Sequence, residues 1–179
     1  MEPTRVLVAD DHAVLRTAVR ALLETEPDMV VAGEAASGEE AVAAALALRP
    51  DVVVMDLSMH GCGGLEATRT IAASSGSRVL VLTMHGEDEA LLAALHAGAS
   101  GYLSKSAAPD ALVRAVRLVA RGEVALSPSG VRTLVRAVAP GRLPSGCKPC
   151  GGTMRPTPDL HPHVHARHSP ARRAQSHRT

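Results

Sequence analysis

Four short, largely apolar runs of strand length recur in the N-terminal part of the chain, and each ends in a polar residue. The runs occupy residues 6–9, 52–55, 79–82 and 101–104, and the polar residues at their ends are Asp10, Asp11, Asp56, Thr83 and Lys105. Continuous apolar runs are typical of strands that helices cover on both faces, as in a parallel sheet. The carboxyl ends of such strands meet at one edge of the sheet, where ligands bind. We therefore expect these five side chains to converge on one site.

The segments between the runs carry apolar residues at helical spacing. Helices are predicted at residues 12–25, 38–48, about 65–74, about 87–97 and about 109–121, and one more strand at 29–35. Ser37 can cap the second of these helices, with Glu40 as its capping-box partner. Five strands that alternate with five helices, joined by right-handed crossovers, predict an α/β fold with a doubly wound, five-stranded parallel sheet.

Composition narrows the class of protein. The chain has 179 residues, no Trp, no Phe and a single Tyr, so its core must consist of Ala, Val, Leu and Met, and Tyr102 stands out. No apolar run approaches the ~18 residues of a membrane span, and the N-terminus enters a strand pattern without a signal peptide. Three cysteines without a framework spacing favour a reducing compartment. We expect a soluble, cytoplasmic protein.

The net charge of +1 is divided unevenly along the chain. Residues 1–139 carry 12 Lys and Arg against 17 Asp and Glu, whereas residues 140–179 carry 7 basic residues and one Asp. The second segment is rich in Pro and His and poor in large apolar residues, which predicts a largely disordered, basic tail. Its Cys147 and Cys150, with the histidines that follow, suggest zinc ligands. The spacing lacks a second ligand pair and a surrounding apolar core, which favours adventitious metal binding over a structural zinc site.

The five polar residues suit one chemistry when they are taken together. An acidic pair such as Asp10 and Asp11 is by itself more often a helix cap than a metal site. Carboxylates on adjacent strand ends, however, supply the oxygen ligands that Mg²⁺ prefers. The carboxylate of Asp56 can act as a nucleophile and accept a phosphoryl group as an acyl phosphate. Lys105 and the ion would offset charge on that group, and the hydroxyl of Thr83 could donate to one of its oxygens.

With these residues and the motifs around them, the chain resembles a response-regulator receiver domain of the NarL/FixJ type, whose members carry a LuxR-type output domain. The matching motifs are residues 6–12 with Arg16, residues 55–59 with 64–67, residues 82–85 and residues 97–105. The resemblance covers roughly residues 4–125. It implies a flavodoxin-like sheet with strand order 2-1-3-4-5, a receiver domain over residues 1–125, a helical linker over 126–139 and the tail over 140–179.

The resemblance also implies a role for each matching residue. Asp56 resembles the aspartate that a histidine kinase phosphorylates in the presence of Mg²⁺. The implied metal ligands are Asp10, Asp11, Asp56 and the backbone carbonyl of Ser58. Thr83 and Lys105 match the pair that binds the phosphoryl group. Tyr102 matches an aromatic switch that turns inward when Thr83 moves, so that phosphorylation alters the signalling face made by the fourth helix, the fifth strand and the fifth helix.

His60 departs from the family, which usually has Pro at this position. Pro would stiffen the loop after the phosphorylated strand. His60 loosens that loop and could place an imidazole near the phosphoryl group. We therefore consider His60 a modulator of the lifetime of phosphorylation, beside the simpler interpretation of a neutral loop substitution.

The sequence leaves open which output domain, if any, the receiver domain controls. The related transcription regulators end in a helix-turn-helix of about 60 residues that places a recognition helix in the major groove. Here the helical pattern stops near Ala139, so the helix-turn-helix is expected to be missing and sequence-specific DNA binding is doubtful.

Three interpretations of function follow. The first is a phosphorelay response regulator of a family that binds DNA, able to form homodimers. The second is a stand-alone or truncated receiver that acts as a phosphate sink or in mixed dimers with full-length regulators. The third interpretation belongs to another functional class, an enzyme that transfers phosphoryl groups through an aspartyl phosphate. Such enzymes carry a second Asp two residues after the nucleophile, where this chain has Ser58, so we expect no enzyme.

Overall fold

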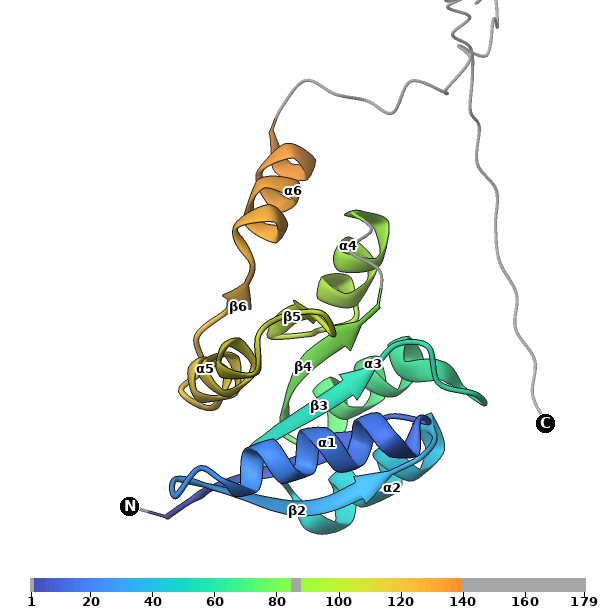
Figure 1. Cartoon of the computed structure of the whole chain (residues 1–179). Helices are drawn as coiled ribbons and strands as arrows, with labels where there is room; N and C mark the ends of the chain where they lie inside the picture. The colour runs from blue at the N-terminus through green and yellow to red at the C-terminus, as the bar shows by residue number, and fades with distance from the viewer. Residues whose placement is uncertain (1, 85–87, 140–179) are drawn as a thin grey trace, which may run out of the picture. The chain divides into compact units, whose positions relative to one another are not determined.

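The computed structural model describes residues 2–84 and 88–139 (Figure 1). The predictions for the tail, including Cys147 and Cys150, and the part of the 82–85 motif at His85 lie outside the described residues. The described chain contains six strands: β1 (Thr4–Ala9), β2 (Met29–Ala35), β3 (Val52–Asp56), β4 (Arg78–Thr83), β5 (Gly101–Ser104) and β6 (Ala125–Leu126). It contains six helices: α1 (Ala13–Glu24), α2 (Gly38–Leu48), α3 (Gly63–Ser74), α4 (Asp88–His96), α5 (Pro109–Ala120) and α6 (Pro128–Val138).

All strand pairs are parallel, and the strand order is β2-β1-β3-β4-β5-β6. This confirms the predicted α/β fold and the order 2-1-3-4-5, and it corrects the number of strands from five to six. The extra strand pairs Ala125 and Leu126 with Gly101 and Tyr102 at the edge of the sheet. A strand of two residues is too short to give a periodic pattern, which is why the sequence did not predict it.

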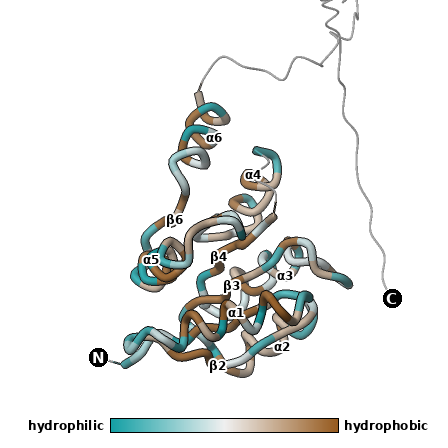
Figure 2. The backbone as a smooth tube through the Cα atoms, in the orientation of Figure 1, coloured by the Kyte–Doolittle hydropathy of each residue, from teal (hydrophilic) through white to brown (hydrophobic). Residues whose placement is uncertain are grey.

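Alternate residues of each central strand pack into two separate cores, as the pleat of a strand requires. One core joins Leu7, Val53 and Val81 to helices α2, α3 and α4. The other core joins the neighbouring strand positions, among them Val54 and Leu80, to α1 and α5. Figure 2 shows apolar and polar residues alternating around α5 and α6, as expected for helices with only one covered face.

Local signals place the helices as the sequence predicted. Ser37 precedes α2 and its Oγ accepts the amide of Glu40 at 3.2 Å. The Glu40 carboxylate in turn accepts the amide of Ala36 at 2.8 Å, so the capping box forms with its return bond one residue earlier than usual. Ser127 caps α6 by accepting the amide of Gly130 at 3.1 Å. Within the described residues, no helix is long and apolar enough to span a membrane.

Gly64 fixes the path of the loop that follows β3. Its backbone passes so close to the strand end that an added Cβ would lie 1.8 Å from the carbonyl oxygen of Asp56. The Gly64 amide donates to the carbonyl of Leu57 at 3.2 Å. Only glycine permits this approach, which brings the start of α3 against the carboxyl end of β3.

Candidate functional site

Lys105 joins the acidic residues at the carboxyl edge of the sheet. Its Nζ lies 2.7 Å from Asp10 Oδ2 and 2.8 Å from Asp56 Oδ2. Asp10 follows β1, Asp56 ends β3 and Lys105 follows β5, so three strands separated in sequence contribute to one cluster. The convergence that the apolar runs predicted is therefore present for these three side chains.

The cluster is buried, although it is rich in charge. Asp10, Asp56 and Thr83 expose 4%, 1% and 3% of their surface. Buried carboxylates are tolerated when a cation pairs with them. Burial lowers the pKa of the Lys105 ammonium, but hydrogen bonds to Asp10 and Asp56 outweigh this and leave that pKa above its ordinary value. Lys105 therefore stays charged and holds two like-charged carboxylates together.

Asp11 lies between two imidazoles that come from different loops. Its Oδ1 is 2.8 Å from His12 Nδ1, and its Oδ2 is 2.7 Å from His60 Nδ1. Burial raises the pKa of the Asp11 carboxyl, but the hydrogen bond with His60 and the electrostatic interactions with His12 and His60 outweigh it and leave that pKa below its ordinary value. His60 itself is exposed over 93% of its side chain. The contact of His60 is thus with Asp11, from the solvent side.

Backbone groups and one arginine orient the carboxylates. The amide of Ser58 donates to Asp56 Oδ1 at 3.2 Å, and the amide of His12 donates to Asp10 Oδ1 at 2.8 Å. Arg16, on the first turns of α1, donates to the backbone carbonyl of Asp10 at 2.6 Å and pairs with Glu34 on β2. Sequence reasoning used Arg16 only as part of a motif and missed this role. The sequence signal for this role is a basic residue about one and a half helical turns after the acidic pair. At that spacing the Arg16 side chain can reach back to the end of β1.

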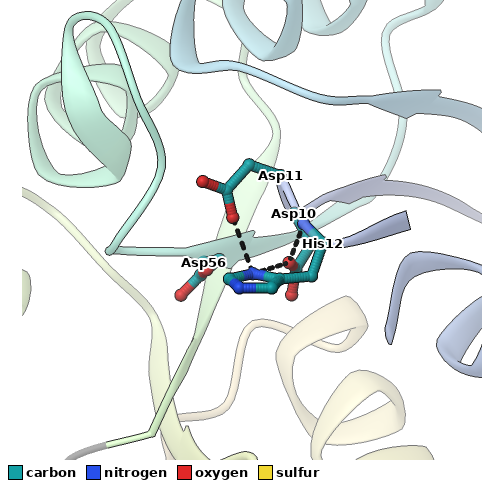
Figure 3. Close-up of side chains that lie close together, drawn as sticks. All are labelled: Asp10, Asp11, His12 and Asp56. Carbon is teal, nitrogen blue, oxygen red and sulfur yellow. Dashed lines mark hydrogen bonds and ion pairs between the residues drawn. The ribbon is translucent and has the colours of Figure 1, made fainter. Parts of the chain in front are cut away.

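The donor set suits a divalent cation. Asp10, Asp11, His12 and Asp56 each offer one ligand atom, and these atoms lie within 4.8 Å of one another. Figure 3 shows three of these groups in contact: the His12 ring reaches both Asp11 and Asp10. Carboxylate oxygens are the ligands that Mg²⁺ prefers, so the residues fit the ion that the sequence predicted. The nitrogen ligand His12 was not among the predicted ligands.

Thr83 and Tyr102 occupy the neighbouring strands. Thr83 ends β4 and pairs in register with Ser104, while Tyr102 pairs with Val81. Tyr102 exposes 6% of its surface and packs in the core that includes Leu91 of α4. The two predicted switch residues are therefore on adjacent strands, Thr83 at the carboxyl end of β4 and Tyr102 in the core beside α4.

The chain belongs to the response regulator receiver domain family, whose sequence profile matches residues 6–117. Among curated proteins it is similar to the response regulator UvrY of Escherichia coli K12, with 46% identity over 119 residues, which is 66% of this chain and 55% of UvrY. It is also similar to the nitrate/nitrite response regulator protein NarL of Escherichia coli K12, with 37% identity over 142 residues, 79% of this chain and 66% of NarL. The chain thus spans about half the length of UvrY.

Solved structures give the same result. A two-component response regulator of the LuxR family from Aurantimonas sp. SI85-9A1 has a TM-score of 0.71 and 39% identity, over 76% of this chain and 98% of that one. The receiver domain of the putative response regulator NarL from Mycobacterium tuberculosis has a TM-score of 0.67 and 33% identity, over 69% of this chain and all of that one. The resemblance inferred from the motifs is confirmed.

Proposed function

We propose that this chain is the phosphoryl-accepting component of a two-component system: Asp56 accepts a phosphoryl group from a histidine kinase in the presence of Mg²⁺, in the cytoplasm. The observation that carries the proposal is the carboxylate of Asp56, buried at the end of β3 and held 2.8 Å from Lys105 Nζ inside an acidic cluster. A receiver domain needs a nucleophilic carboxylate, a cation site and a basic group within reach of one phosphoryl group, and this cluster supplies all three.

The chemistry follows from the contacts around Asp56. An oxygen of Asp56 attacks phosphorus, the new O–P bond forms, and the N–P bond of the kinase phosphohistidine breaks with its electron pair returning to the imidazole. Mg²⁺ held by Asp10, Asp11 and Asp56, with the Ser58 carbonyl as the further ligand we propose, would neutralise the phosphoryl oxygens. Lys105 already contacts Asp56, so a short movement of its ammonium brings it onto the new phosphoryl group.

Thr83 and Tyr102 would carry the signal to the surface. Thr83 lies at the end of β4 and can donate its hydroxyl to a phosphoryl oxygen once that group is present. Its movement would change the packing between Tyr102 and α4, which share a core. A cavity of about 170 Å³ lies next to this core and gives the ring room to move; its lining includes Leu91, Tyr102, Gly130 and Thr133. Phosphorylation would then bias the α4–β5–α5 face between two states.

The role of this chain in DNA binding rests on the sequence prediction that a helix-turn-helix is missing. The described residues hold the receiver fold and α6, without the recognition helix of a helix-turn-helix. We therefore propose only that this chain belongs to a family whose members regulate transcription by binding DNA. Action as a phosphate sink, or in homodimers or mixed dimers with full-length regulators, is the alternative. The phosphotransferase alternative is disfavoured because the position two residues after Asp56 is Ser58, whose amide holds Asp56 and whose side chain cannot act as a carboxylic acid.

His60 enters the proposal as a modulator of phosphorylation lifetime through Asp11. Its imidazole contacts an oxygen of a proposed Mg²⁺ ligand, so its loss would alter how Asp11 is held. Replacing His60 with Pro, the residue that the family usually has there, should change the rate at which the acyl phosphate is lost.

Mass spectrometry after incubation with acetyl phosphate and Mg²⁺ tests the main proposal. We expect a gain of one phosphoryl group in the natural chain and none in Asp56→Asn. Asp110→Asn is the matched control, because Asp110 is an exposed residue of α5 that pairs with Arg114 one turn along the same helix. Full labelling of Asp56→Asn would refute the assignment of Asp56.

A further inference from the structure

Helix α6 covers part of the face next to Tyr102, and no step of the proposed phosphoryl transfer uses this helix. Within α6, Gly130 and Thr133 are buried. The backbone of Gly130 runs so close to α4 that an added Cβ would lie 3.5 Å from Leu91 Cδ2. At the base of α6, Leu126 of β6 pairs in register with Tyr102 of β5. Helix α6 therefore packs on α4 and is joined to the strand that carries Tyr102 (Figure 1).

One hydrogen bond fixes α6 on the start of α4. The hydroxyl of Thr133 donates to Oδ1 of Asp88, the first residue of α4, although the two residues are 45 positions apart in the chain. Thr133 exposes only 7% of its surface, and a buried hydroxyl that loses its partner destabilises the state that contains it. The docked position of α6 therefore depends on where the first turn of α4 places Asp88.

A cavity of about 170 Å³ lies beside this hydrogen bond. Its lining includes both partners, Asp88 and Thr133, together with Leu91 and Tyr102. Tyr102 and Leu91 belong to the same apolar core, and Leu126 packs against that core. Because packed interiors transmit displacements between neighbours, a turn of the Tyr102 ring changes the surface on which α6 rests.

The start of α4 is also close in the chain to the proposed site. Asp88 follows Thr83, the last residue of β4, by five positions. The contact between α6 and α4 exists together with the pair between Lys105 and Asp56 Oδ2, in which the carboxylate itself is the partner of the ammonium. In the proposed function Thr83 moves toward a phosphoryl group on Asp56, and we expect this movement to shift Asp88 away from Thr133.

We propose that α6 is an autoinhibitory helix: it docks on α4 and β5 while Lys105 pairs with the carboxylate of Asp56, and phosphorylation of Asp56 releases it. The inference rests on the proposed function, since it concerns the regulation of the same site. The hydrogen bond between Thr133 and Asp88 holds the docked state. Because coupling between two sites is reciprocal, docking of α6 opposes phosphorylation by the same factor by which phosphorylation weakens docking. Release of α6 uncovers α4 and β5 to a partner.

Hydrogen exchange of the full chain, measured with and without Mg²⁺ and beryllofluoride, tests the release of α6. Beryllofluoride serves as a mimic of the phosphoryl group. We expect the amides of α6 to exchange about two- to tenfold faster with beryllofluoride, because a hydrogen bond of the docked state is lost. The amides of α2, which packs on β2 and α3, are the internal reference and should keep their rates. Unchanged or slower exchange in α6 would overturn the proposal.

The reciprocal effect is measured by calorimetric titration with beryllofluoride in the presence of Mg²⁺. Thr133→Val removes the hydroxyl and should tighten beryllofluoride binding by about two- to tenfold, the equivalent of one net hydrogen bond. Thr133→Ser keeps the hydroxyl and is the matched control, with the affinity of the natural chain. Unchanged or weaker binding in Thr133→Val would contradict an autoinhibitory role.

A double-mutant cycle separates this contact from a general effect on either helix. Asp88→Ala removes the acceptor from the side of α4 and should tighten beryllofluoride binding as Thr133→Val does. The double variant should bind no more tightly than either single variant, because both substitutions remove the same interaction. Additive effects would show that the two residues act independently, and the proposal would then fail.

The fluorescence of Tyr102 keeps this inference distinguishable from the proposed function. The chain has a single Tyr and no Trp, so its intrinsic fluorescence reports this ring. Tyr102 exposes 6% of its surface, and Thr133→Val should increase its quenching by acrylamide without any phosphodonor. If beryllofluoride binds but neither α6 exchange nor Tyr102 quenching changes, only the autoinhibitory helix is wrong. If Asp56 stays unlabelled while Thr133→Val exposes Tyr102, the proposed function falls and the coupling of α6 to Tyr102 stands.

Discussion

Lys105 Nζ lies 2.8 Å from Asp56 Oδ2, and both side chains are almost fully buried. The same ammonium contacts Asp10 at 2.7 Å. A single cation thus compensates two carboxylates in a region from which water is largely excluded. This arrangement stabilises the unphosphorylated site and also places the ammonium where a phosphoryl group on Asp56 would need it.

Removal of that cation should destabilise the fold strongly. Lys105→Met leaves two buried carboxylates without their partner, and we expect a loss of about 3 kcal/mol in the free energy of unfolding. Mg²⁺ should restore part of the loss, because it binds the folded state only. Urea unfolding with and without Mg²⁺ measures both effects. Arg114→Met, at an exposed pair on α5, should change stability by less than about 1 kcal/mol; equal losses in the two variants would contradict the role of Lys105.

Gly64→Ala should damage the site without touching a charged residue. The new Cβ would lie 1.8 Å from the Asp56 carbonyl oxygen, so the loop after β3 must shift. We expect a loss of about 2–3 kcal/mol in stability and slower phosphorylation of Asp56. Gly130→Ala, whose Cβ would meet only ordinary contacts, is the control. A Gly64→Ala chain with natural stability would show that the approach of the two backbones is not tight.

The pair between Arg117 and Asp28 predicts a pH dependence. Arg117 Nε and Nη2 donate to the Asp28 carboxylate at 2.8 and 2.7 Å, and these bonds lower the pKa of Asp28 below its ordinary value of 3.8. A carboxyl whose pKa is lower in the folded state stabilises the fold above its unfolded pKa. That contribution is lost as the pH falls through the folded pKa.

Arg117→Gln should therefore flatten the acid side of the stability profile. We expect the natural chain and the variant to differ above the ordinary Asp28 pKa of 3.8 and to converge as the pH falls through the lowered pKa of the folded state. Urea unfolding at a series of pH values measures the difference. A gap between the two chains that is the same at every pH would mean that Arg117 acts through packing alone.

Thr133 connects α6 to the signalling face. Its hydroxyl donates to the Asp88 carboxylate at the start of α4, and its Oγ1 also lies 3.2 Å from the carbonyl oxygen of Ser129 in its own helix. Thr133→Val removes the link to α4, and we expect a loss of about 0.5–1.5 kcal/mol together with faster hydrogen exchange in α6. Ser129→Ala is a control on the same helix. If α6 exchanges at the natural rate in Thr133→Val, the helix is held by its apolar contacts alone.

The sequence predicted most of the architecture because strand ends and helix caps are local signals. The end of each apolar run placed Asp10, Asp56 and Lys105 at one edge, and their contacts agree with that prediction. The roles assigned to Thr83, Tyr102 and Ser58 remain predictions. β6 escaped prediction because two residues carry no period.

Contacts between loops could not be predicted from the sequence. The sequence offered two interpretations of His60, an imidazole near the phosphoryl group or a neutral loop substitution, but gave no sign of its contact with Asp11, a residue 49 positions earlier in the chain. The position of His12 depends on the turn after β1, and the contact of Thr133 with Asp88 depends on how α6 folds back. Such contacts depend on loop geometry, for which residue type alone gives no signal.

Locating the phosphoryl group by tandem mass spectrometry tests the central claim most directly. After reaction with a small phosphodonor and Mg²⁺, reduction with borohydride converts an acyl phosphate of aspartate to homoserine and marks its position. We predict homoserine at position 56 alone. A mark at Asp10 or Asp11, or a phosphoryl group retained on His12 or His60, would contradict the account, since the nucleophile would then be another member of the cluster.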